Sequence, residues 1–437
     1  MTKLPSLKGR LLALEQSPPS AWSLTGAHSR PNLHGLLRYP AMMVPRMQGD
    51  IIDVILAHKQ GACRVLDPFV GSGTVMTEAL VRDLNFTGID INPLAALVCE
   101  AKAAIDDGTD VEGAAQIVLS SLRRDVGETI DADFPGRAKW FDDESSRKFS
   151  VLRRAIMQVA EGGARKVMWT VFTETVRLCS NSRTSTYKLH IRKDGDRVAP
   201  EKVLETFELH LRLALMRVRE YRDLLNARSR ERPSVRIICE DARKANIDWS
   251  SSEHQLLVTS PPYGDNQTTI PYGQFSYLAM RWIPAEDLPS VAAATLMANT
   301  NTLDAVSLGG TITGAEAKQA AVRDVSPHFD AFVRNAEQAG KGKAIRKVSS
   351  FMGDFAEAVT HLRSSATTTA HWVLTTGNRT AAGLTVPFDA ICKDLVVNLG
   401  GKPIASLRRQ LPNKRMPSRN SQGAMITVET TTVIEFS

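Results

Sequence analysis

The chain has 437 residues, of which 43% are hydrophobic, and a formal net charge of +7 at pH 7. This length and composition predict a globular protein with one large domain that carries an insertion or two small ones. No run approaches the roughly 20 apolar residues of a membrane span, and residues 1–10 lack the apolar stretch of a secretory signal. We therefore expect a cytoplasmic protein with no membrane partner.

Five cysteines are spread along the chain without the short paired spacing of zinc sites or disulfide frameworks. We expect reduced, mostly buried thiols and no bound metal. The basic residues are concentrated in the middle of the chain, where residues 151–236 contain 19 Lys or Arg against 10 Asp or Glu. This local surplus favours a polyanionic partner for that segment.

Residues 1–30 are rich in Pro, Ser and Gly and have no clear period, so we expect an arm that lies on the surface or is partly disordered. Strands and helices then alternate: the pattern predicts a helix at 51–57, a strand at 63–66, a helix at 74–84, a strand at 86–90 and a helix entered at Pro93. Such alternation implies parallel strands joined by right-handed crossovers. The result would be a doubly wound sheet whose ligand lies at the carboxyl ends of the strands.

After residue 105 this alternation stops. Residues 111–228 have mostly helical patterning, and we interpret 109–234 as a helical basic insertion. Strands resume at 235–239 and 255–259, whereas residues 286–345 carry few large apolar side chains and are expected to form loops and short helices over the site. The remaining pattern predicts a helix at 351–362, a strand at 371–376, a helix at 388–399 and strands at 403–407 and 425–434. Residues 31–108 and 235–437 would then form one α/β domain around a seven-stranded, mostly parallel sheet.

A glycine-rich loop, Asp67-Pro68-Phe69-Val70-Gly71-Ser72-Gly73-Thr74, follows the first predicted strand. A phosphate-binding loop would have a lysine after its last glycine, and none follows Gly73; a nicotinamide site would have a third glycine where Met76 stands. An adenosine cofactor with a methionine end fits better. Asp67 can accept a hydrogen bond from its ammonium group, and Gly71 and Gly73 allow the backbone to approach it closely.

Two further carboxylates follow predicted strands. Asp90 ends the second strand, where it can hold both ribose hydroxyls of such a cofactor; the alternative is that it caps the helix entered at Pro93. Asp241 follows the third strand, where the carboxylate or the neighbouring backbone can bond the adenine amino group. An ordinary loop carboxylate is the alternative for Asp241.

The tetrapeptide Ser260-Pro261-Pro262-Tyr263 follows the fourth predicted strand, and its two prolines turn the chain out of the sheet. An exocyclic amine on a nucleobase is a poor nucleophile, because its lone pair is delocalised into the ring. If Ser260 and the carbonyl of Pro261 both accept hydrogen bonds from the amine, the lone pair can point at a methyl donor. Tyr263 offers a face on which an extruded base can stack.

Methylation at carbon 5 of cytosine would need a cysteine nucleophile, typically one that follows a proline. None of the five cysteines follows a proline, so that chemistry is disfavoured. The expected reaction is therefore methylation of an amine without a covalent enzyme intermediate.

With these motifs the chain resembles the amino-group DNA methyltransferases, which combine a Phe-x-Gly-x-Gly loop with a Ser-, Asp- or Asn-Pro-Pro-Tyr motif in one sheet. The resemblance implies a Rossmann-like class I methyltransferase fold, with S-adenosylmethionine as cofactor. It assigns Tyr39 and Pro40 to the methionine end of the cofactor, with a packing turn as the alternative. The implied cofactor-binding residues are Tyr39, Pro40, Asp67, Pro68, Phe69, Gly71, Gly73, Thr74, Asp90, Asn92, Asp241 and Ala242, and the implied catalytic residues are Ser260, Pro261, Pro262 and Tyr263.

The resemblance implies site-specific methylation of double-stranded DNA, with a restriction endonuclease or another defence protein as a further partner. Serine as the first residue of the tetrapeptide favours N4 of cytosine over N6 of adenine. Similar Pro-Pro-Tyr loops modify guanine amines in transfer RNA, so RNA methylation is an alternative. A catalytically silent DNA-binding component that keeps the fold is a third.

DNA contacts are expected from a polar, basic stretch at 177–190 and from a short basic turn at 408–419. Residues 264–269, directly after the tetrapeptide, are expected to contact the flipped nucleotide or to close over it. The insertion precedes Asp241 and does not occupy the usual place of a target-recognition domain, so the segment that reads the DNA sequence stays open. The candidate DNA-binding residues are Arg177, Asn181, Arg183, Lys188, Lys414 and Arg415.

Overall fold

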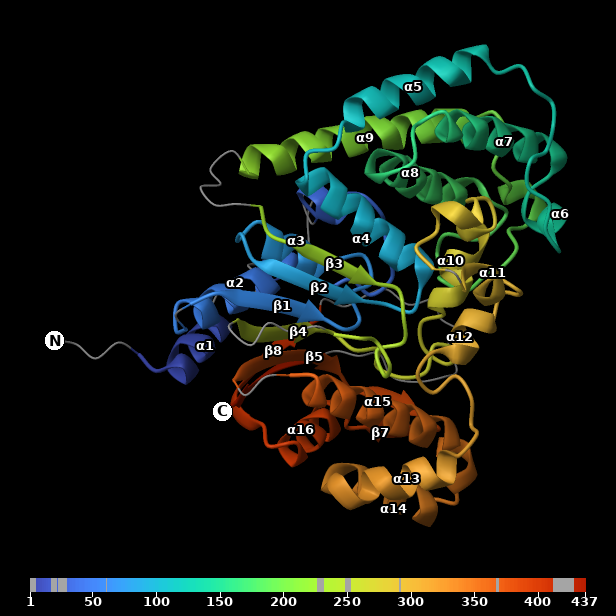
Figure 1. Ribbon diagram of the computed structural model, residues 1–437. Helices are drawn as coiled ribbons and strands as arrows, with labels where there is room; N and C mark the ends of the chain where they lie inside the picture. Colours follow the sequence, from blue (N-terminus) through green and yellow to red (C-terminus); the bar gives the residue numbers. More distant parts are fainter. Residues whose placement is uncertain are drawn as a thin grey trace.

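The structure is a computed structural model that describes residues 5–16, 22, 30–59, 61–225, 232–247, 253–290, 292–366, 369–411 and 428–437. Its centre is a seven-stranded sheet with the strand order β3-β2-β1-β4-β5-β9-β8 (Figure 1). The strands are β1 (Cys63–Asp67), β2 (Asn85–Ile89), β3 (Val235–Ile238), β4 (His254–Thr259), β5 (Ala370–Gly377), β8 (Lys402–Gln410) and β9 (Val428–Phe436). Strands β3, β2, β1, β4 and β5 pair in parallel, and β9 pairs antiparallel with both β5 and β8. The predicted seven-stranded, mostly parallel sheet is thus confirmed.

The parallel register brings the carboxyl ends of the central strands to one edge of the sheet. Leu66 of β1 pairs with Thr87 of β2 on one side and with Leu257 of β4 on the other. The loops after β1, β2 and β4 therefore begin side by side. This edge is the expected place for a ligand in a doubly wound sheet.

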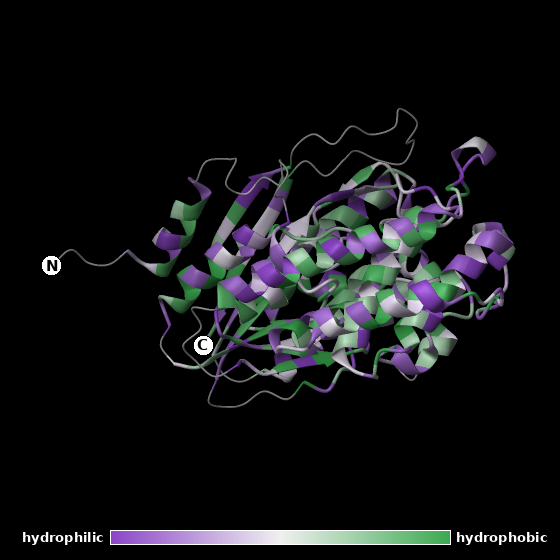
Figure 2. Cartoon of the chain, turned by 90° about the horizontal axis from the view of Figure 1, so that it is seen from above, coloured by the Kyte–Doolittle hydropathy of each residue, from purple (hydrophilic) through white to green (hydrophobic). Residues whose placement is uncertain are grey.

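Helices cover both faces of the sheet. On one face lie α2 (Pro45–Leu56) and α3 (Thr74–Leu80), whose Ile51 and Met76 belong to one apolar cluster with Val65 of β1. On the other face lie α15 (Arg346–Ser364) and α16 (Phe388–Asn398), which pack on strands β1, β4 and β5. Along the helices in Figure 2, hydrophobic and hydrophilic residues alternate, as expected of helices with one buried face.

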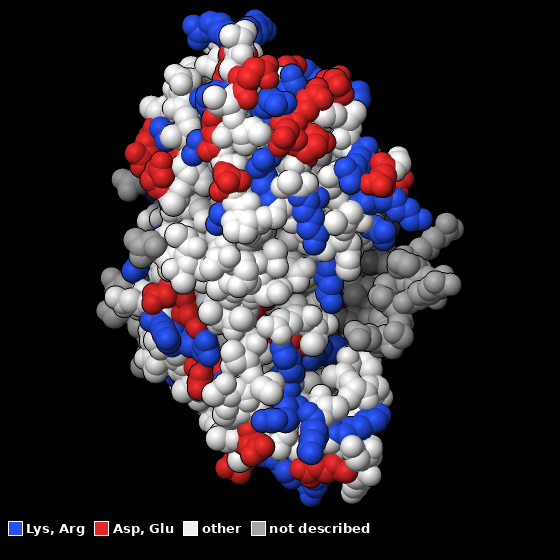
Figure 3. All heavy atoms as spheres, turned by 90° about the vertical axis from the view of Figure 1, so that its right-hand side faces the viewer, with Lys and Arg blue, Asp and Glu red and all other residues white. Residues whose placement is uncertain are grey.

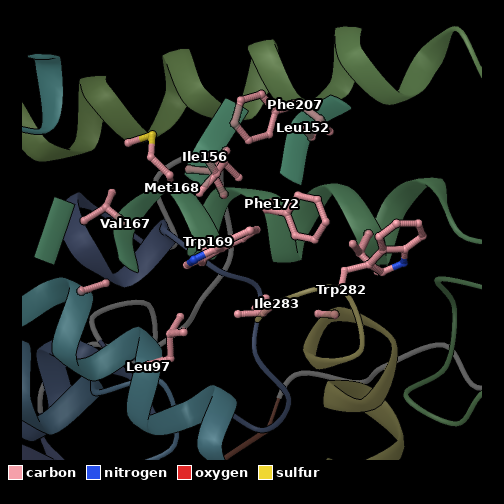
Figure 4. Packing of buried hydrophobic residues seen from close by; sticks show 14 of the residues in the cluster. Leu97, Leu152, Ile156, Val167, Met168, Trp169, Phe172, Phe207, Trp282 and Ile283 are labelled. Carbon is pink, nitrogen blue, oxygen red and sulfur yellow. The ribbon is translucent and has the colours of Figure 1, made fainter. Parts of the chain in front are cut away.

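A layer of helices stands on α4 (Pro93–Asp106), above the sheet in Figure 1. It consists of α5 (Val111–Arg124), α6 (Arg137–Trp140), α7 (Asp143–Met157), α8 (Gly163–Cys179) and α9 (Lys202–Leu225). Figure 4 shows Trp169, Phe172 and Phe207 packed between these helices, and all three are fully buried. The two ends of the segment meet, because the guanidinium of Arg232 donates a hydrogen bond to the carbonyl of Asp107.

The rest of the chain supplies shorter elements near the site and a second helical group below the sheet. They are η2 (Asn32–Gly35), η3 (Asp194–Asp196), α10 (Tyr272–Met280), η4 (Ala285–Asp287), α11 (Ala293–Leu296), α12 (Thr302–Val306), α13 (Ala315–Val325), α14 (Pro327–Gln338), η5 (Gly342–Ile345) and a hairpin of β6 (Arg379–Ala381) and β7 (Leu384–Val386). In the described part of the chain, no helix is both long enough and apolar enough to cross a membrane. All five cysteines are free thiols, and four of them are buried.

The structure adds detail to two expectations about local structure. The expected N-terminal arm contains α1 (Leu7–Glu15), because Leu7 and Leu11 lie one turn apart and bury their side chains in the cluster that also holds Leu407 of β8. Residues 286–345 contain the expected short helices, but α13 and α14 lie below the sheet in Figure 1 and not over the site. Helix α13 packs against α15, and α14 packs against α13 and α16 through a buried face that includes Phe329, Phe332 and Val333.

We expect Asp287→Ala to lower the free energy of unfolding by about 3–5 kcal/mol. The Asp287 carboxylate is 5% exposed, accepts a 2.8 Å hydrogen bond from the indole of Trp169 and lies 3.2 Å from the guanidinium of Arg165. The substitution leaves the partly buried guanidinium of Arg165 and the buried indole N–H of Trp169 without this partner. Urea unfolding followed by tryptophan fluorescence measures the change. As control, Asp194→Ala removes an exposed ion pair with Arg197 and should cost less than about 0.5 kcal/mol; equal losses would contradict the assignment.

Candidate active site

An open cavity of about 950 Å³, counted out to its mouth, lies at the carboxyl ends of the central strands. Twelve of the predicted site residues line it: Tyr39, Pro40, Pro68, Phe69, Gly71, Thr74, Asp90, Asn92, Asp241, Ala242, Ser260 and Pro262. The other four, Asp67, Gly73, Pro261 and Tyr263, belong to the same loops but are not part of the cavity wall.

The glycine loop needs its glycines for conformation and for space. Gly71 and Gly73 have φ of +50° and +74°, in the left-handed region that side chains disfavour. A Cβ on Gly73 would lie 3.1 Å from the sulfur of Cys99, and one on Gly71 would lie 3.4 Å from the ring of Tyr39. The loop therefore runs close to the aromatic wall of the cavity and leads directly into α3.

Asp67 ends β1 and is fully buried. Its Oδ1 accepts hydrogen bonds from the hydroxyl of Thr259, at 2.6 Å, and from the backbone N–H of Phe69, at 3.1 Å. Within the described residues, its Oδ2 has no hydrogen-bond partner. Burial raises the pKa of Asp67 to about 7, against the lowering effect of the two hydrogen bonds. An unpaired, buried carboxylate oxygen fits a cationic donor from a ligand.

Asp90 is held in the cavity wall by two backbone hydrogen bonds. Its Oδ2 accepts from the N–H of Gly71, and its Oδ1 accepts from the N–H of Asn92, both at 2.9 Å. The cap of α4 is Asn92, whose side chain accepts from the N–H of Leu94, so the alternative that Asp90 caps this helix is wrong. Burial raises the pKa of Asp90 to about 6.

Aromatic side chains form the wall of the cavity beside Gly71 of the glycine loop. The ring of Tyr39 stacks on Tyr272 at a centroid distance of 5.8 Å and meets Phe275 edge-on at 5.4 Å. The amide of Asn92 donates to the hydroxyl of Tyr39 at 3.0 Å and to that of Ser276 at 2.7 Å. Helix α10, which carries three of these residues, was not recognised as part of the site, because its aromatic spacing resembles that of any buried helix.

Lys102 of α4 is a further residue that the motifs did not identify. It is 1% exposed, and its ammonium group donates a 2.5 Å hydrogen bond to the carbonyl of Ser72 in the glycine loop. Burial lowers the pKa of Lys102 from its ordinary value of 10.5 to about 8. The signal available in the sequence was a lysine in a helix that is otherwise apolar near its start. The hydrogen bond from Lys102 to Ser72 holds the glycine loop against α4.

Asp241 reaches the cavity, but its carboxylate is already engaged. The guanidinium of Arg243 binds it through two nitrogens, with the shortest contact at 2.6 Å, and also lies 3.1 Å from a carboxylate oxygen of Asp354. An adenine amino group would share the carboxylate with Arg243 or bond the backbone at Ala242. The backbone alternative therefore suits the geometry better.

The tetrapeptide after β4 faces the cavity through Ser260 and Pro262. The hydroxyl of Ser260 donates to the hydroxyl of Tyr263 at 3.4 Å, and Tyr263 donates to Glu429 of β9 at 3.3 Å. The carboxylate of Glu429 in turn accepts from Arg409 of β8. The ring of Tyr263 lies 6.5 Å from that of Phe388, so these contacts fix its orientation at the edge of the site.

The loop that follows the tetrapeptide is held from both sides. Asp265 is fully buried, accepts a 2.5 Å hydrogen bond from Thr268 and lies 3.7 Å from the guanidinium of Arg379. Asn266 lines the cavity. The segment 264–269 is therefore beside the site, where a contact to a bound nucleotide is geometrically possible.

The predicted DNA-binding residues lie in different environments. Arg177 is paired with Glu174 at 2.6 Å, and Asn181 is 6% exposed; neither side chain is free at the surface. Arg183 is exposed and Lys188 is half-buried, in a loop closed by the bridge between Ser182 and Ile191. Lys414 and Arg415 lie outside the described residues.

The loop at 182–191 packs against α10, and so lies near the cavity. The ring of Tyr187 meets that of Phe275 edge-on at 6.1 Å, and the N–H of Leu189 donates to Gln274 at 3.2 Å. The guanidinium of Arg192 donates to the carbonyls of Leu178, Ser180 and Ser182. These contacts hold the loop in one conformation.

Comparison with known proteins adds sequence relatives. No protein-family model matches the chain. The chain is 29% identical over 407 residues to the type II methyltransferase M.MvaI of Kocuria varians, across 88% of this chain and 85% of that protein. It is also 27% identical over 93 residues to the type II methyltransferase M.MjaII of Methanocaldococcus jannaschii, which covers 21% of this chain and 16% of that protein. Similarity along most of both chains, as with M.MvaI, extends far beyond the two motifs.

We expect the stability difference between the wild type and Lys102→Met to change with pH. Because the pKa of Lys102 is about 8 when folded and near 10.5 when unfolded, the unfolded chain binds more protons between these values. Stability of the wild type should therefore rise, relative to the variant, as pH increases from 8 to 10.5. Urea unfolding at several pH values measures this difference, and a constant difference would contradict the lowered pKa of Lys102.

Proposed function

This chain is a homologue of the type II DNA methyltransferases, and we propose that it methylates the exocyclic amine of a base extruded from double-stranded DNA. The observation that best supports this proposal is that Ser260, Asp90 and the glycine loop line the same cavity. An amine acceptor and a ribose-binding carboxylate are thus within reach of one bound cofactor. Homology with methyltransferases favours S-adenosylmethionine, whose sulfonium supplies the electrophilic methyl group.

The donor set of the cavity suits this cofactor. The free Oδ2 of Asp67 can accept from the ammonium group, and the carboxylate of Asp90 keeps lone pairs for the two ribose hydroxyls. Tyr39 contributes an aromatic wall beside Gly71. The backbone at Ala242 is available for the adenine amino group.

Ser260 and the carbonyl of Pro261 would then hold the target amine. Two acceptors on one amine turn its lone pair out of conjugation with the ring and toward the methyl group. The amine loses a proton when the new N–C bond forms, and the hydroxyls of Ser260 and Tyr263 would relay a proton to the carboxylate of Glu429, which accepts the hydrogen bond of Tyr263. Tyr263 would also present its ring to the extruded base.

The base is proposed to be cytosine, methylated at N4, since serine begins the tetrapeptide. The partner is proposed to be duplex DNA, with the loop at 182–191 on one side of the site; Arg183 and Lys188 have no ion pair within the described residues. A restriction endonuclease that recognises the same sequence is the proposed companion. Methylation of RNA and a silent DNA-binding role are the competing functions.

Binding of S-adenosylmethionine should weaken as the pH falls below about 7. In the free protein Asp67 is protonated below its pKa of about 7, and the ammonium group binds the ionised form, so binding expels a proton. Affinity should decrease by up to about tenfold per pH unit, with a further contribution from Asp90 below about 6. Calorimetry in buffers of different ionisation enthalpy measures the released protons. Asp67→Asn should bind more weakly at pH 8 and lose the dependence around pH 7; if it keeps that dependence, Asp67 does not bind the ammonium group.

Ser260→Ala should lower kcat by about 10²–10³-fold, because one acceptor of the target amine is lost, and should leave the affinity for S-adenosylmethionine unchanged. Transfer of labelled methyl to DNA, followed by nucleoside analysis, measures the rate and identifies the base. N6-methyladenine would overturn the choice of cytosine, and preferential labelling of transfer RNA would favour the RNA alternative. Cofactor binding without transfer to many DNA sequences would favour the silent role.

A further inference from the structure

A second basic stretch without acidic residues lies at the turn between α14 and α15. Residues 339–347 contain Lys341, Lys343, Arg346 and Lys347 and no Asp or Glu. Ile345 is fully buried and anchors the turn in the core below the sheet. Lys343 and Arg346 are exposed, and Lys341 is half-buried.

Lys347 connects this turn to the loop that follows the tetrapeptide. Its ammonium group donates to the side-chain carbonyl of Gln267 and lies 3.6 Å from a carboxylate oxygen of Asp265. The amide of Gln267 donates to the carbonyl of Gly310 at 3.2 Å. These contacts to the loop after the tetrapeptide hold the turn beside the candidate active site. The turn is therefore positioned by more than contacts at the solvent-exposed surface.

The other three cations are available to a partner. Among the described residues, no carboxylate forms an ion pair with Lys341, Lys343 or Arg346. These three cationic side chains lie in one turn, and no acidic side chain in that turn neutralises them. Together they can bind a partner that carries several neighbouring negative charges. The sugar–phosphate backbone of DNA carries such a row of charges.

The turn lies across the site from the loop at 182–191. That loop packs on α10, which lies to the right of β3 in Figure 1, whereas the turn joins α14 to α15 below the sheet. Figure 3 looks onto the edge of the molecule at the right of Figure 1, where Lys and Arg form a broken column from the upper to the lower part of the face. A duplex along this column would meet basic groups on both sides of the cavity.

We propose that residues 339–347 bind the DNA backbone on the side of the extruded base opposite to the loop at 182–191, through Lys341, Lys343 and Arg346. This inference rests on the proposed function. Extrusion of a base costs unpairing and unstacking free energy. Backbone contacts on both sides hold the flanking duplex in register while the base occupies the cavity.

The test is a triple variant, K341Q/K343Q/R346Q, compared with the wild type for binding to duplex DNA at several salt concentrations. Each lost phosphate contact reduces the slope of log K against log salt by about 0.9, so the slope should become less steep by about 2–3. Affinity should fall on the order of tenfold or more, equally for different sequences. The kcat at saturating DNA and the affinity for S-adenosylmethionine should not change.

A matched control is K8Q/K393Q/K402Q, which removes the same charge from exposed positions on α1, α16 and β8, and should leave the slope unchanged. Equal slopes for the triple variant and the wild type would overturn the proposal, as would a loss of affinity for transfer RNA but not for duplex DNA. If the wild type binds duplex DNA with a steep slope of log K against log salt but transfers no methyl group, the proposed function is wrong. The proposal that residues 339–347 bind the DNA backbone would still stand.

Discussion

The site depends on one hydrogen bond between two strand ends. The hydroxyl of Thr259, the last residue of β4, donates to Asp67, the last residue of β1, at 2.6 Å. The glycine loop starts at Asp67 and the tetrapeptide follows directly after Thr259, although 192 positions separate these two residues in the chain. The bond also leaves the second oxygen of Asp67 unpaired, so the interaction that joins the two loops also prepares the carboxylate for a cationic ligand. Parallel pairing of β1 with β4 makes this geometry possible.

Sequence patterns predicted the sheet because each strand is apolar and is followed by a loop with a distinct chemical signature. The motifs also identified most of the cavity wall. Lys102, Arg243 and α10 were missed, since their roles come from contacts between distant segments: Lys102 reaches Ser72, and Arg243 binds both Asp241 and Asp354. Helix α1 was missed because two buried leucines in a Pro- and Ser-rich stretch give a weak periodic signal. The division into domains and the roles of the site residues stay predictions.

Buried charge recurs around the cavity and has a common effect. Asp67, Asp90 and Lys102 all carry pKa values shifted toward the neutral form by burial. Such groups cost folding free energy when ionised, and of the three, Asp67 is the one proposed to meet a charged group of the ligand. The free protein is in this sense prepared electrostatically for its cofactor, at the expense of stability.

The hydrogen bond from Arg232 to the carbonyl of Asp107 closes the two ends of the helical segment against each other. The segment therefore leaves the sheet and returns to it at one point, as a long loop does. Everything between these ends can differ in length or sequence without shifting the register of β1, β2 and β4. The helical segment can thus diversify in evolution while the geometry at the carboxyl ends of these strands stays constant.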